Sequence, residues 1–377
     1  MPSRNEQLSA LLTEHIEAGD FPSAVYLVAE RGQAIFADAL GHSVVDPYHI
    51  VTQPDTIYDL ASLTKPLITA MLCARRIEAG ELTPDSSVSH YLPEFDRPDK
   101  QMITVRELLT HSSGLPAWRP LYVLAEGEPE RTLGEIANLD LEYKSGTRVV
   151  YSDLGFITLG FLLERMTGQR LAHMASQEII RTLNLQSTFF NPAVARQTGI
   201  AASETGNAYE RDTFEQTGAG NYHAWRQGLI WGEVHDGNAH FLGGAAGHAG
   251  LFSTASETQV LARQFLAEQS TLLKPESCLL FRTNMTKGLE EARSVGWQLA
   301  ATKDSTAGPD LPADSFGHTG FTGTSCWLDP NHQRVFILLT NRTHARSIPF
   351  ANINSVRRQF HSLAVAALEP LSGELVY

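Results

Sequence analysis

Cysteine is scarce in this sequence, with only Cys73, Cys278 and Cys326 among 377 residues. The odd count, the long spacings and the lack of a C-x-x-C pair favour buried free thiols over paired cysteines. Long apolar runs are missing as well, because no stretch approaches the roughly 20 apolar residues that a membrane-spanning helix needs. We therefore expect neither a disulfide framework nor a transmembrane segment.

Positively charged residues are also fewer than negatively charged ones. The chain has 29 Lys and Arg against 42 Asp and Glu, which gives a formal net charge of −13. No basic stripe is present that would meet phosphates, so we expect no nucleic-acid partner, and an anionic membrane surface is disfavoured for the same reason. The N-terminal segment lacks the apolar core and the small-residue cleavage site of a signal peptide, which predicts a cytoplasmic location.

Two motifs of common enzyme classes are absent. No G-x-S-x-G elbow is present, which argues against an α/β-hydrolase. The Gly-rich segment Leu242–Gly250 lacks the G-x-G-x-x-G spacing of a dinucleotide site and follows no clear strand. We expect this segment to be tight backbone beside the active-site cleft, and we expect no cofactor.

Strand-rich segments lie near both ends of the chain, and helical patterns fill the stretch between them. The strand-like segments are residues 23–30, 33–41, 295–300, 316–329 and 334–341. Amphipathic helices are predicted at residues 5–19 and at the C-terminus. This order predicts an α/β protein of two domains: an antiparallel sheet from both termini (1–80 and 286–377) flanked by helices, and an inserted, mainly helical domain (81–285).

The stretch YDLASLTKP places Ser62 and Lys65 three residues apart, where an apolar helix is predicted to begin. On a helix, residues at i and i+3 face the same way, so the lysine reaches back over the serine. A serine hydroxyl needs a group that takes its proton, and a lysine is such a base only when it is neutral. The Ser62 N–H would lie at a helix N-terminus, where a developing oxyanion is stabilised. The S-x-x-K pattern alone is weak, because it also occurs by chance.

Two further motifs accompany this pair. YSDLG (residues 151–155) precedes a predicted helix, and GHTGFTGTS (residues 317–325) lies on a late strand. In this order and at these separations, the three motifs resemble the serine β-lactamase and penicillin-binding-protein superfamily, above all its class C-like branch of DD-peptidases, esterases and cell-wall amidases. TVRELLTHSSGLP, GHAGLFSTASE and VGWQL also look like landmarks of that superfamily. The resemblance covers nearly the whole chain and implies a β-lactamase/transpeptidase-like fold.

The resemblance assigns a role to each motif residue. Ser62 would be the acylated nucleophile, Lys65 its proton partner and Tyr151 a second proton-transfer group. The backbone N–H groups of Ser62 and Phe321 would form the oxyanion hole. The substrate would lie beside Asp153 and beside the strand triplet His318, Thr319 and Gly320.

Two of these positions depart from the usual pattern of the superfamily. Asp153 stands where many members carry Asn, and a carboxylate cannot donate a hydrogen bond to a substrate carbonyl. His318 replaces Lys, and because a histidine is only partly charged near neutral pH, a substrate carboxylate loses a permanent cation. Both departures favour a serine hydrolase that acts through an acyl-enzyme on peptide-like amides or small esters, rather than efficient β-lactam hydrolysis.

Several alternatives stay open. A β-lactamase, a DD-carboxypeptidase, and a penicillin-binding or ligand-sensing module with little turnover would all use the same residues. A metal site is considered at four residues, His235, Asp236, His240 and His248. Their spacing matches no compact zinc signature, so no metal site is predicted. His111 is predicted to be a buried structural imidazole. The expected partner is a small-molecule or peptide-like substrate, and no oligomeric state is predicted.

Overall fold

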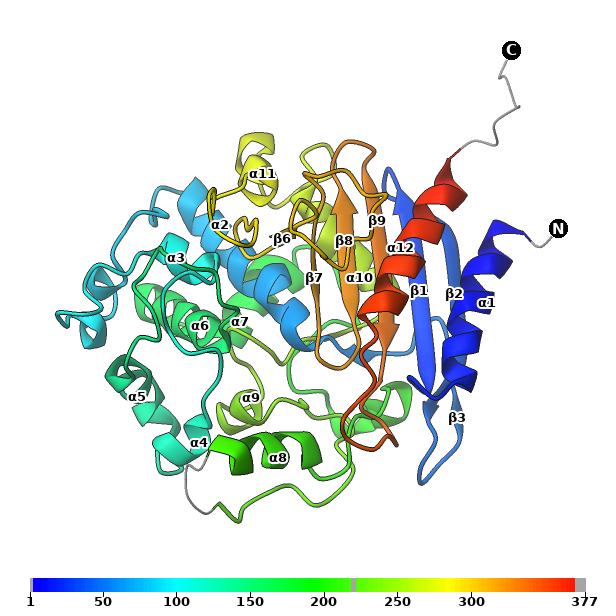
Figure 1. Ribbon diagram of the computed structural model, residues 1–377, viewed down its shortest axis with the longest axis horizontal. Coiled ribbons are helices and arrows are strands. Elements are labelled where there is room, and N and C mark those ends of the chain that lie inside the picture. The colour runs from blue at the N-terminus through cyan, green and yellow to red at the C-terminus, as the bar shows by residue number, and fades with distance from the viewer. Residues whose placement is uncertain (1–2, 218–221, 370–377) are drawn as a thin grey trace.

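The computed structural model describes residues 3–217 and 222–369 and contains a seven-stranded antiparallel sheet in the order β3-β2-β1-β9-β8-β7-β6 (Figure 1). The strands are β1 (Ser23–Glu30), β2 (Gln33–Val44), β3 (Ile50–Val51), β6 (Gln298–Leu299), β7 (Phe316–Thr319), β8 (Ser325–Asp329) and β9 (Arg334–Thr340). Strands β1 and β9 are neighbours, in a register that pairs Val28 with Phe336. The sheet is therefore built from both ends of the chain, as the sequence predicts.

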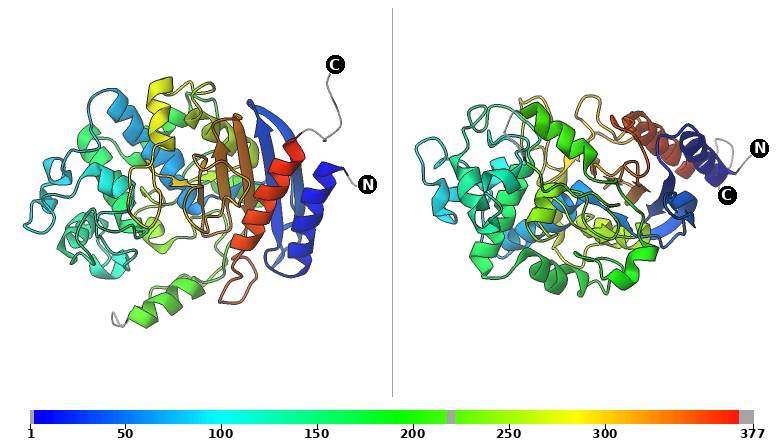
Figure 2. Two further views of the ribbon diagram at one scale, coloured as in Figure 1. Left: turned by 45° about the horizontal axis from the view of Figure 1, so that its top comes forward. Right: turned by 90° about the horizontal axis from the view of Figure 1, so that it is seen from below.

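Helices α1 (Arg4–Glu17) and α12 (Asn354–Leu368) cover one face of this sheet (Figure 1 and Figure 2). Their amphipathic patterns explain this position, because each helix buries one apolar stripe. The cluster that they form with the sheet includes Leu8 of α1, Phe360 of α12 and Trp327 of β8. The predicted flanking by terminal helices is confirmed.

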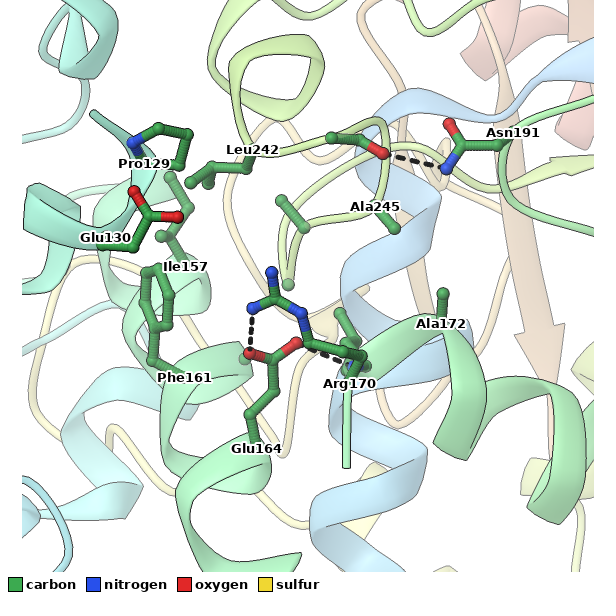
Figure 3. A pocket seen from close by; sticks show the side chains of 15 residues that line it. Pro129, Glu130, Ile157, Phe161, Glu164, Arg170, Ala172, Asn191, Leu242 and Ala245 are labelled. Carbon is green, nitrogen blue, oxygen red and sulfur yellow. Dashed lines mark hydrogen bonds and ion pairs between the residues drawn. The ribbon is translucent and has the colours of Figure 1, made fainter. Parts of the chain in front are cut away.

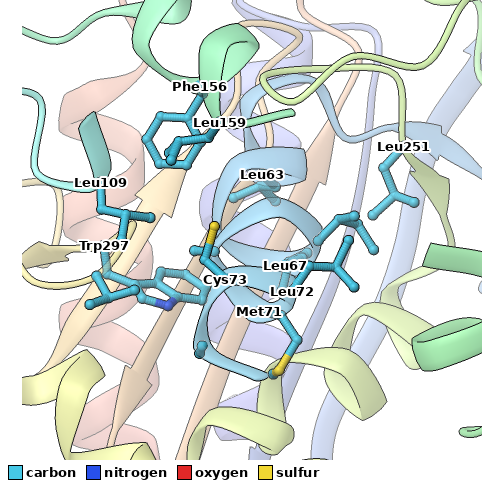
Figure 4. Packing of buried hydrophobic residues seen from close by; sticks show 14 of the residues in the cluster. Leu63, Leu67, Met71, Leu72, Cys73, Leu109, Phe156, Leu159, Leu251 and Trp297 are labelled. Atoms are coloured by element: carbon cyan, nitrogen blue, oxygen red, sulfur yellow. The ribbon is translucent and has the colours of Figure 1, made fainter. Parts of the chain in front are cut away.

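The opposite face of the sheet contacts the largest hydrophobic core, which surrounds α2 (Met71–Glu78) (Figure 4). Leu67, just before this helix, and Trp297 both belong to this core. Strand β1 contributes alternate residues, because successive side chains of a strand point to opposite faces; they are Val25, Leu27 and Ala29. The nucleophile motif is thus attached to the most deeply buried part of the molecule.

In the stretch between the two groups of strands, most of the regular elements are helices. Its helices are α3 (Val105–Leu109), α4 (Leu121–Leu124), α5 (Thr132–Asn138), α6 (Asp153–Thr167), α7 (Leu171–Ala175), α8 (Ala208–Thr217), α9 (Gly237–Phe241), α10 (Ala255–Ala262) and α11 (Pro275–Arg282). Strands β4 (Tyr58–Asp59) and β5 (Phe252–Ser253) form a separate two-stranded sheet. Helix α10 packs against β1 and β9, and the division into domains at residues 80 and 286 stays a prediction.

Two local expectations differ from the structure. The helix expected from Ser62 is a regular α-helix only from Met71, because a 3₁₀ turn (Ala61–Leu63) and a π turn (Lys65–Ala70) precede it. Pro66 has no N–H to donate, which suits such an irregular stretch. The segment 316–329 is two strands, β7 and β8, joined by a tight turn.

Two other expectations concern the whole chain. All three cysteines are free and buried, as predicted. None of the helices within residues 3–217 and 222–369 combines the length and the apolar character needed to cross a bilayer.

Candidate active site

Ser62 lies in the 3₁₀ turn between β4 and α2. The preceding residue, Ala61, has a φ of 48°, a left-handed conformation that is unfavourable for a residue with a Cβ. The Asp59 carboxylate holds this turn, because its Oδ1 accepts the Ala61 N–H at 2.9 Å and its Oδ2 accepts the His235 N–H at 2.8 Å. Asp59 thus stabilises the 3₁₀ turn that carries Ser62, which we call the serine turn, and connects it by hydrogen bonds to the loop before α9.

Lys65 reaches back over Ser62, as the spacing of the two residues predicts. Its Nζ donates to Ser62 Oγ at 2.9 Å and to the His248 carbonyl at 3.2 Å, and it lies 2.6 Å from Asp153 Oδ1. Burial lowers the pKa of Lys65, but the charge of Asp153 and hydrogen bonds with Asp153 and Tyr151 outweigh it, so the pKa lies above its ordinary value. The resting lysine is therefore an ammonium, and not the neutral base that S-x-x-K chemistry requires.

Tyr151 lies immediately before α6, next to the helix cap Ser152. The centroid of its ring is 4.8 Å from Lys65 Nζ. Burial raises the pKa of Tyr151, while the charge of Lys65 and hydrogen bonds with Lys65 and Ser62 act in the opposite direction and do not outweigh it. The resting site therefore places a neutral phenol and an ammonium beside one serine hydroxyl.

The turn between β7 and β8 is fastened to the serine turn. Thr322 Oγ1 donates to the Asp59 carbonyl at 2.8 Å, and Thr324 Oγ1 donates to the Leu60 carbonyl at 3.0 Å. Gly320 permits this close approach, because a Cβ there would lie 2.1 Å from Thr324 Oγ1 and 2.6 Å from the Leu60 oxygen. A glycine is therefore required at this position of the strand triplet, because any side chain would push the β7–β8 turn away from the serine turn.

This fastened turn carries Phe321, the second predicted oxyanion donor. Among the described residues, no acceptor bonds the backbone N–H of Phe321 or that of Ser62. Both residues line the same two cavities. Two free N–H donors beside a nucleophile are the arrangement that stabilises an oxyanion.

His318 differs from the expectation that it is partly charged. Burial and the nearby charges of Lys65 and Arg293 hold the pKa of His318 well below its ordinary value, so the imidazole is neutral near pH 7. Its Nδ1 lies 2.8 Å from the Thr319 carbonyl, an acceptor, so Nδ1 carries the proton and Nε2 does not. The expectation of a partial positive charge at this position is wrong.

Arg293 places a permanent cation in the site, although the sequence pattern did not single it out. The residue is 6% exposed, and its Nε and Nη2 donate to Glu291 Oε2 at 2.9 and 2.6 Å. Its Cζ lies 5.9 Å from the centroid of the Tyr151 ring. Within the described part of the chain, Nη1 has no hydrogen-bond partner. One guanidinium donor is therefore left for a ligand.

Two cavities meet at Ser62, Tyr151 and Phe321, and their linings carry opposite charge. The first, which we call the arginine cavity, has a volume of about 650 Å³ and one carboxylate, and its cations are Arg293, Arg342 and Arg357. The second, which we call the carboxylate cavity, has a volume of about 260 Å³ and, within the described residues, no Lys or Arg in its lining. Its carboxylates are Asp153, Glu210 and Asp236.

The histidines weighed as metal ligands are paired with carboxylates instead. The pairs are His235 with Glu204 at 2.8 Å, His248 with Asp236 at 2.8 Å and His240 with Glu233 at 3.4 Å. In the part of the chain that the structure describes, no three His, Cys, Asp or Glu side chains converge so that they could hold a metal ion. His111 is buried, and its Nδ1 accepts the Ser152 N–H at 3.0 Å, which confirms its structural role.

The Gly-rich segment Leu242–Gly250 lies against the active site, as predicted. Its carbonyls at Gly247 and His248 accept hydrogen bonds from Thr69 and Lys65. A third cavity borders this segment, and its charged residues Glu164 and Arg170 pair at 3.2 Å (Figure 3). None of the predicted catalytic or substrate-binding residues lines this cavity, so it lies outside the active site.

Comparison with known proteins decides the family. The family model described as Beta-lactamase matches residues 8–356. The chain belongs to the β-lactamase family. Two named relatives of this β-lactamase-family protein are an Escherichia coli K12 protein named "Putative D-alanyl-D-alanine carboxypeptidase" and a Bacillus subtilis strain 168 "N-acetylmuramyl-L-alanine amidase". The first is 31% identical over 370 residues, covering 91% of this chain and 83% of the relative, and the second is 31% identical over 363 residues, covering 90% and 81%.

Solved structures agree on the fold of this β-lactamase-family protein. EstCE1, described as a hydrolase with promiscuous acyltransferase activity, superposes with a TM-score of 0.72 at 20% identity, covering 97% of this chain and 98% of that one. A penicillin-binding-protein homologue from Caulobacter crescentus superposes with a TM-score of 0.73 at 20% identity and the same coverage. The predicted β-lactamase/transpeptidase-like fold is confirmed, and the protein is a serine hydrolase of this family.

The structure of this serine hydrolase brings the predicted site residues to one place. Ser62, Tyr151 and Phe321 line both cavities, and buried Lys65 lies behind them. Asp153 lines the carboxylate cavity, and the strand triplet lines the arginine cavity; the triplet is His318, Thr319 and Gly320.

Three contributors to the site are missing from the sequence interpretation: Asp59, Arg293 and Glu210. The sequence could have pointed to Asp59, because it is a charged residue among the mostly apolar residues that open YDLASLTKP. Glu210 left none, because it comes from a segment without a motif, and Arg293 lies two residues before the VGWQL landmark but outside it.

Proposed function

We propose that Ser62 attacks the carbonyl carbon of a peptide-like amide or a small ester and forms an acyl-enzyme. The observation that carries this proposal is the 2.9 Å contact between Ser62 Oγ and Lys65 Nζ, beside Tyr151. As the bond from Ser62 Oγ to carbon forms, the carbonyl electron pair moves to oxygen, and the N–H groups of Ser62 and Phe321 stabilise that charge. Collapse of the intermediate expels the amine or alcohol, and water then hydrolyses the acyl ester.

The proton of Ser62 passes to the pair of Lys65 and Tyr151, which later returns it to the leaving group. The resting pair is fully protonated, because the pKa of each member lies above its ordinary value. One proton therefore has to leave the pair first. Asp153, which lies 2.6 Å from Lys65 Nζ and is 18% exposed, offers that proton a route to the cleft. On this proposal, Asp153 sets the protonation of the site instead of binding a substrate amide.

The arginine cavity supports a carboxylate on the substrate. A carboxylate accepts charge-assisted bonds from a guanidinium, and Arg293 has a free donor in this cavity. The names of the two relatives point to peptide-like substrates. D-alanyl-D-alanine carboxypeptidase activity is therefore the second candidate function, since its substrate ends in a carboxylate.

The proposal is tested on the Ser62→Ala variant. We expect turnover of p-nitrophenyl butyrate to fall to near background with the melting temperature unchanged. Intact mass of the wild type, quenched during turnover, should show one butyryl group, and the variant should show none. Ser256→Ala, an exposed serine, is the matched control and should keep both turnover and adduct. Substantial turnover by Ser62→Ala would exclude Ser62 as the nucleophile.

The same assay separates an enzyme from a ligand-sensing module. An enzyme releases many equivalents of p-nitrophenol per protein, whereas a covalent sensor releases one equivalent and stops. We expect continued release. A cytoplasmic location stays a prediction from the sequence.

A further inference from the structure

The carboxylate cavity is the part of the active site that the proposed function leaves unexplained. Asp153 has a partner in Lys65, and Asp236 has one in His248. Glu210 of α8, the third carboxylate, has no cation of its own within the described residues. A cavity with this lining disfavours an anion and suits a positively charged group.

Glu210 is held in place by backbone and amide donors and not by a cation. The residue is 8% exposed, and its Oε2 accepts the Gly237 N–H at 3.0 Å and an Asn207 amide hydrogen at 3.3 Å. Gly237 permits this position, because a Cβ there would lie 2.2 Å from Glu210 Oε1. The Tyr122 hydroxyl lies beside the Glu210 carboxyl group and lowers its pKa, but among the described residues neither Oε1 nor this hydroxyl has a hydrogen bond of normal geometry. A buried acceptor whose donor is poorly aligned is costly, so a ligand donor that reaches Oε1 would be stabilised there.

Arg226, whose charge acts on Glu210, is already engaged and does not line the carboxylate cavity. Its guanidinium donates to the carbonyls of Val234 and His235 and to Asn207 Oδ1. Arg226 therefore supports the loop before α9 and leaves Glu210 Oε1 unpaired.

Aromatic rings complete the lining. Trp118 and Tyr209 both line the carboxylate cavity, and the Tyr209 ring lies 4.7 Å from the ring of Phe321. Aromatic faces attract ammonium groups, and more strongly where water is excluded. Tyr209 also connects this lining to the residue whose N–H serves the oxyanion.

We propose that the carboxylate cavity binds an ammonium group of the substrate, with Glu210 as its acceptor. The substrates are then amides or esters that carry an amino group on the arm of the molecule that enters this cavity. This inference rests on the proposed function, since the ammonium group belongs to a substrate that acylates Ser62. Together with the arginine cavity, it describes a cleft for zwitterionic, peptide-like molecules, positive on one side of the scissile bond and negative on the other.

The test compares amino esters with neutral esters of the same shape. The pairs are methyl alaninate, in both enantiomers, with methyl isobutyrate, and methyl 6-aminohexanoate with methyl heptanoate, assayed near pH 7 by release of methanol. Each pair gives a ratio of kcat/KM, amino over neutral, for wild type and for Glu210→Gln. The intrinsic reactivity of the esters cancels when the two ratios are compared. Glu215→Gln is the matched control, since Glu215 lies on the same helix and is exposed.

We expect Glu210→Gln to lower the ratio about 10–100-fold for at least one pair, which corresponds to the loss of one charge-assisted hydrogen bond. Glu215→Gln should leave every ratio unchanged. Equal ratios in wild type and a folded Glu210→Gln variant, for all pairs, overturn the inference. If the ratios are equal while wild type hydrolyses the neutral esters and Ser62→Ala does not, the inference fails and the proposed function stands. If no ester is hydrolysed through Ser62, the proposed function and the inference fail together.

Discussion

Lys65 Nζ lies 2.6 Å from Asp153 Oδ1, and the lysine side chain is fully buried while the carboxylate reaches the cleft. The ion pair keeps the lysine charged despite its burial, because the attraction of the carboxylate outweighs desolvation. The number of protons held by the catalytic residues thus depends on Asp153.

Asp153→Asn should move the pH profile of the enzyme to lower pH. The Asp153 carboxylate raises the pKa values of both Lys65 and Tyr151, so its removal lowers both. The pair then loses its first proton at a lower pH, and the acid limb of kcat/KM for p-nitrophenyl butyrate shifts in the same direction. Asp140→Asn, an exposed control, should leave the profile in place. A shift to higher pH would contradict the proposed proton route.

Lys65→Ala and Tyr151→Phe should each remove most of the activity, and the double variant should lose little more. Both residues hydrogen-bond with Ser62 and act on the same proton, so their effects are not independent. The measurement is a double-mutant cycle in kcat/KM for p-nitrophenyl butyrate. Rate losses that multiply in the double variant would show that the two residues act separately.

Gly320→Ala should reduce kcat about 10²–10³-fold, the usual cost of losing one oxyanion donor. The added Cβ would lie 2.1 Å from Thr324 Oγ1 and 2.6 Å from the Leu60 oxygen, so the β7–β8 turn has to move away from Ser62. Gly134→Ala is the control, because a Cβ there meets nothing within 4 Å. Unchanged kcat in Gly320→Ala would show that Phe321 is not an oxyanion donor.

Glu210→Gln should stabilise the protein at alkaline pH. Burial and the charge of Asp236 raise the pKa of Glu210 from 4.5 to about 7, with Tyr122, His235 and Arg226 acting in the opposite direction. Because the folded pKa is raised, the contribution of this acid to stability is complete below its unfolded pKa and is lost as pH rises through about 7.

The measurement for this variant is the melting temperature as a function of pH. The difference between Glu210→Gln and wild type should rise from about pH 5 to about pH 8. Glu215→Gln should show no such trend. A constant difference would mean that Glu210 does not titrate in this range.

The sequence predicts the framework of this protein because each part of it leaves a local pattern. Short, nearly continuous apolar runs mark β1 and β9, and the S-x-x-K spacing places Lys65 over Ser62. The protonation of the same residues is not predictable in this way. The pKa of Lys65 depends on Asp153, and that of His318 depends on burial and on Arg293, which are close only after folding.

The same limit applies to the specificity of the site. Arg293 lies between α11 and the VGWQL landmark, and Glu210 lies on α8, and neither residue belongs to a recognisable motif. Their chemistry comes from what surrounds them: a free guanidinium donor in one case and a buried, unpaired carboxylate oxygen in the other. Only the three-dimensional arrangement shows that the two charges lie in cavities that meet at Ser62.

Arg293 also changes the expectation for β-lactams. The sequence predicted weak β-lactam hydrolysis for two reasons, the carboxylate of Asp153 and the loss of a fixed cation at His318. The first reason remains, and the second does not, because Arg293 lines the arginine cavity with a free donor. Wild type should therefore turn over nitrocefin more slowly than p-nitrophenyl butyrate, yet the carboxylate of nitrocefin should still be recognised.

Arg293→Gln tests this recognition. It should lower the ratio of kcat/KM, nitrocefin over p-nitrophenyl butyrate, about 10–100-fold, because one charge-assisted bond to the nitrocefin carboxylate is lost and the ester has no carboxylate to lose. The exposed Arg181→Gln is the control and should leave the ratio unchanged. Added salt should weaken the effect little, since Arg293 is 6% exposed and buried charges are poorly screened. If both substrates lose activity equally, Arg293 acts on the catalytic pair through the Tyr151 ring 5.9 Å away, and the arginine cavity does not select carboxylates.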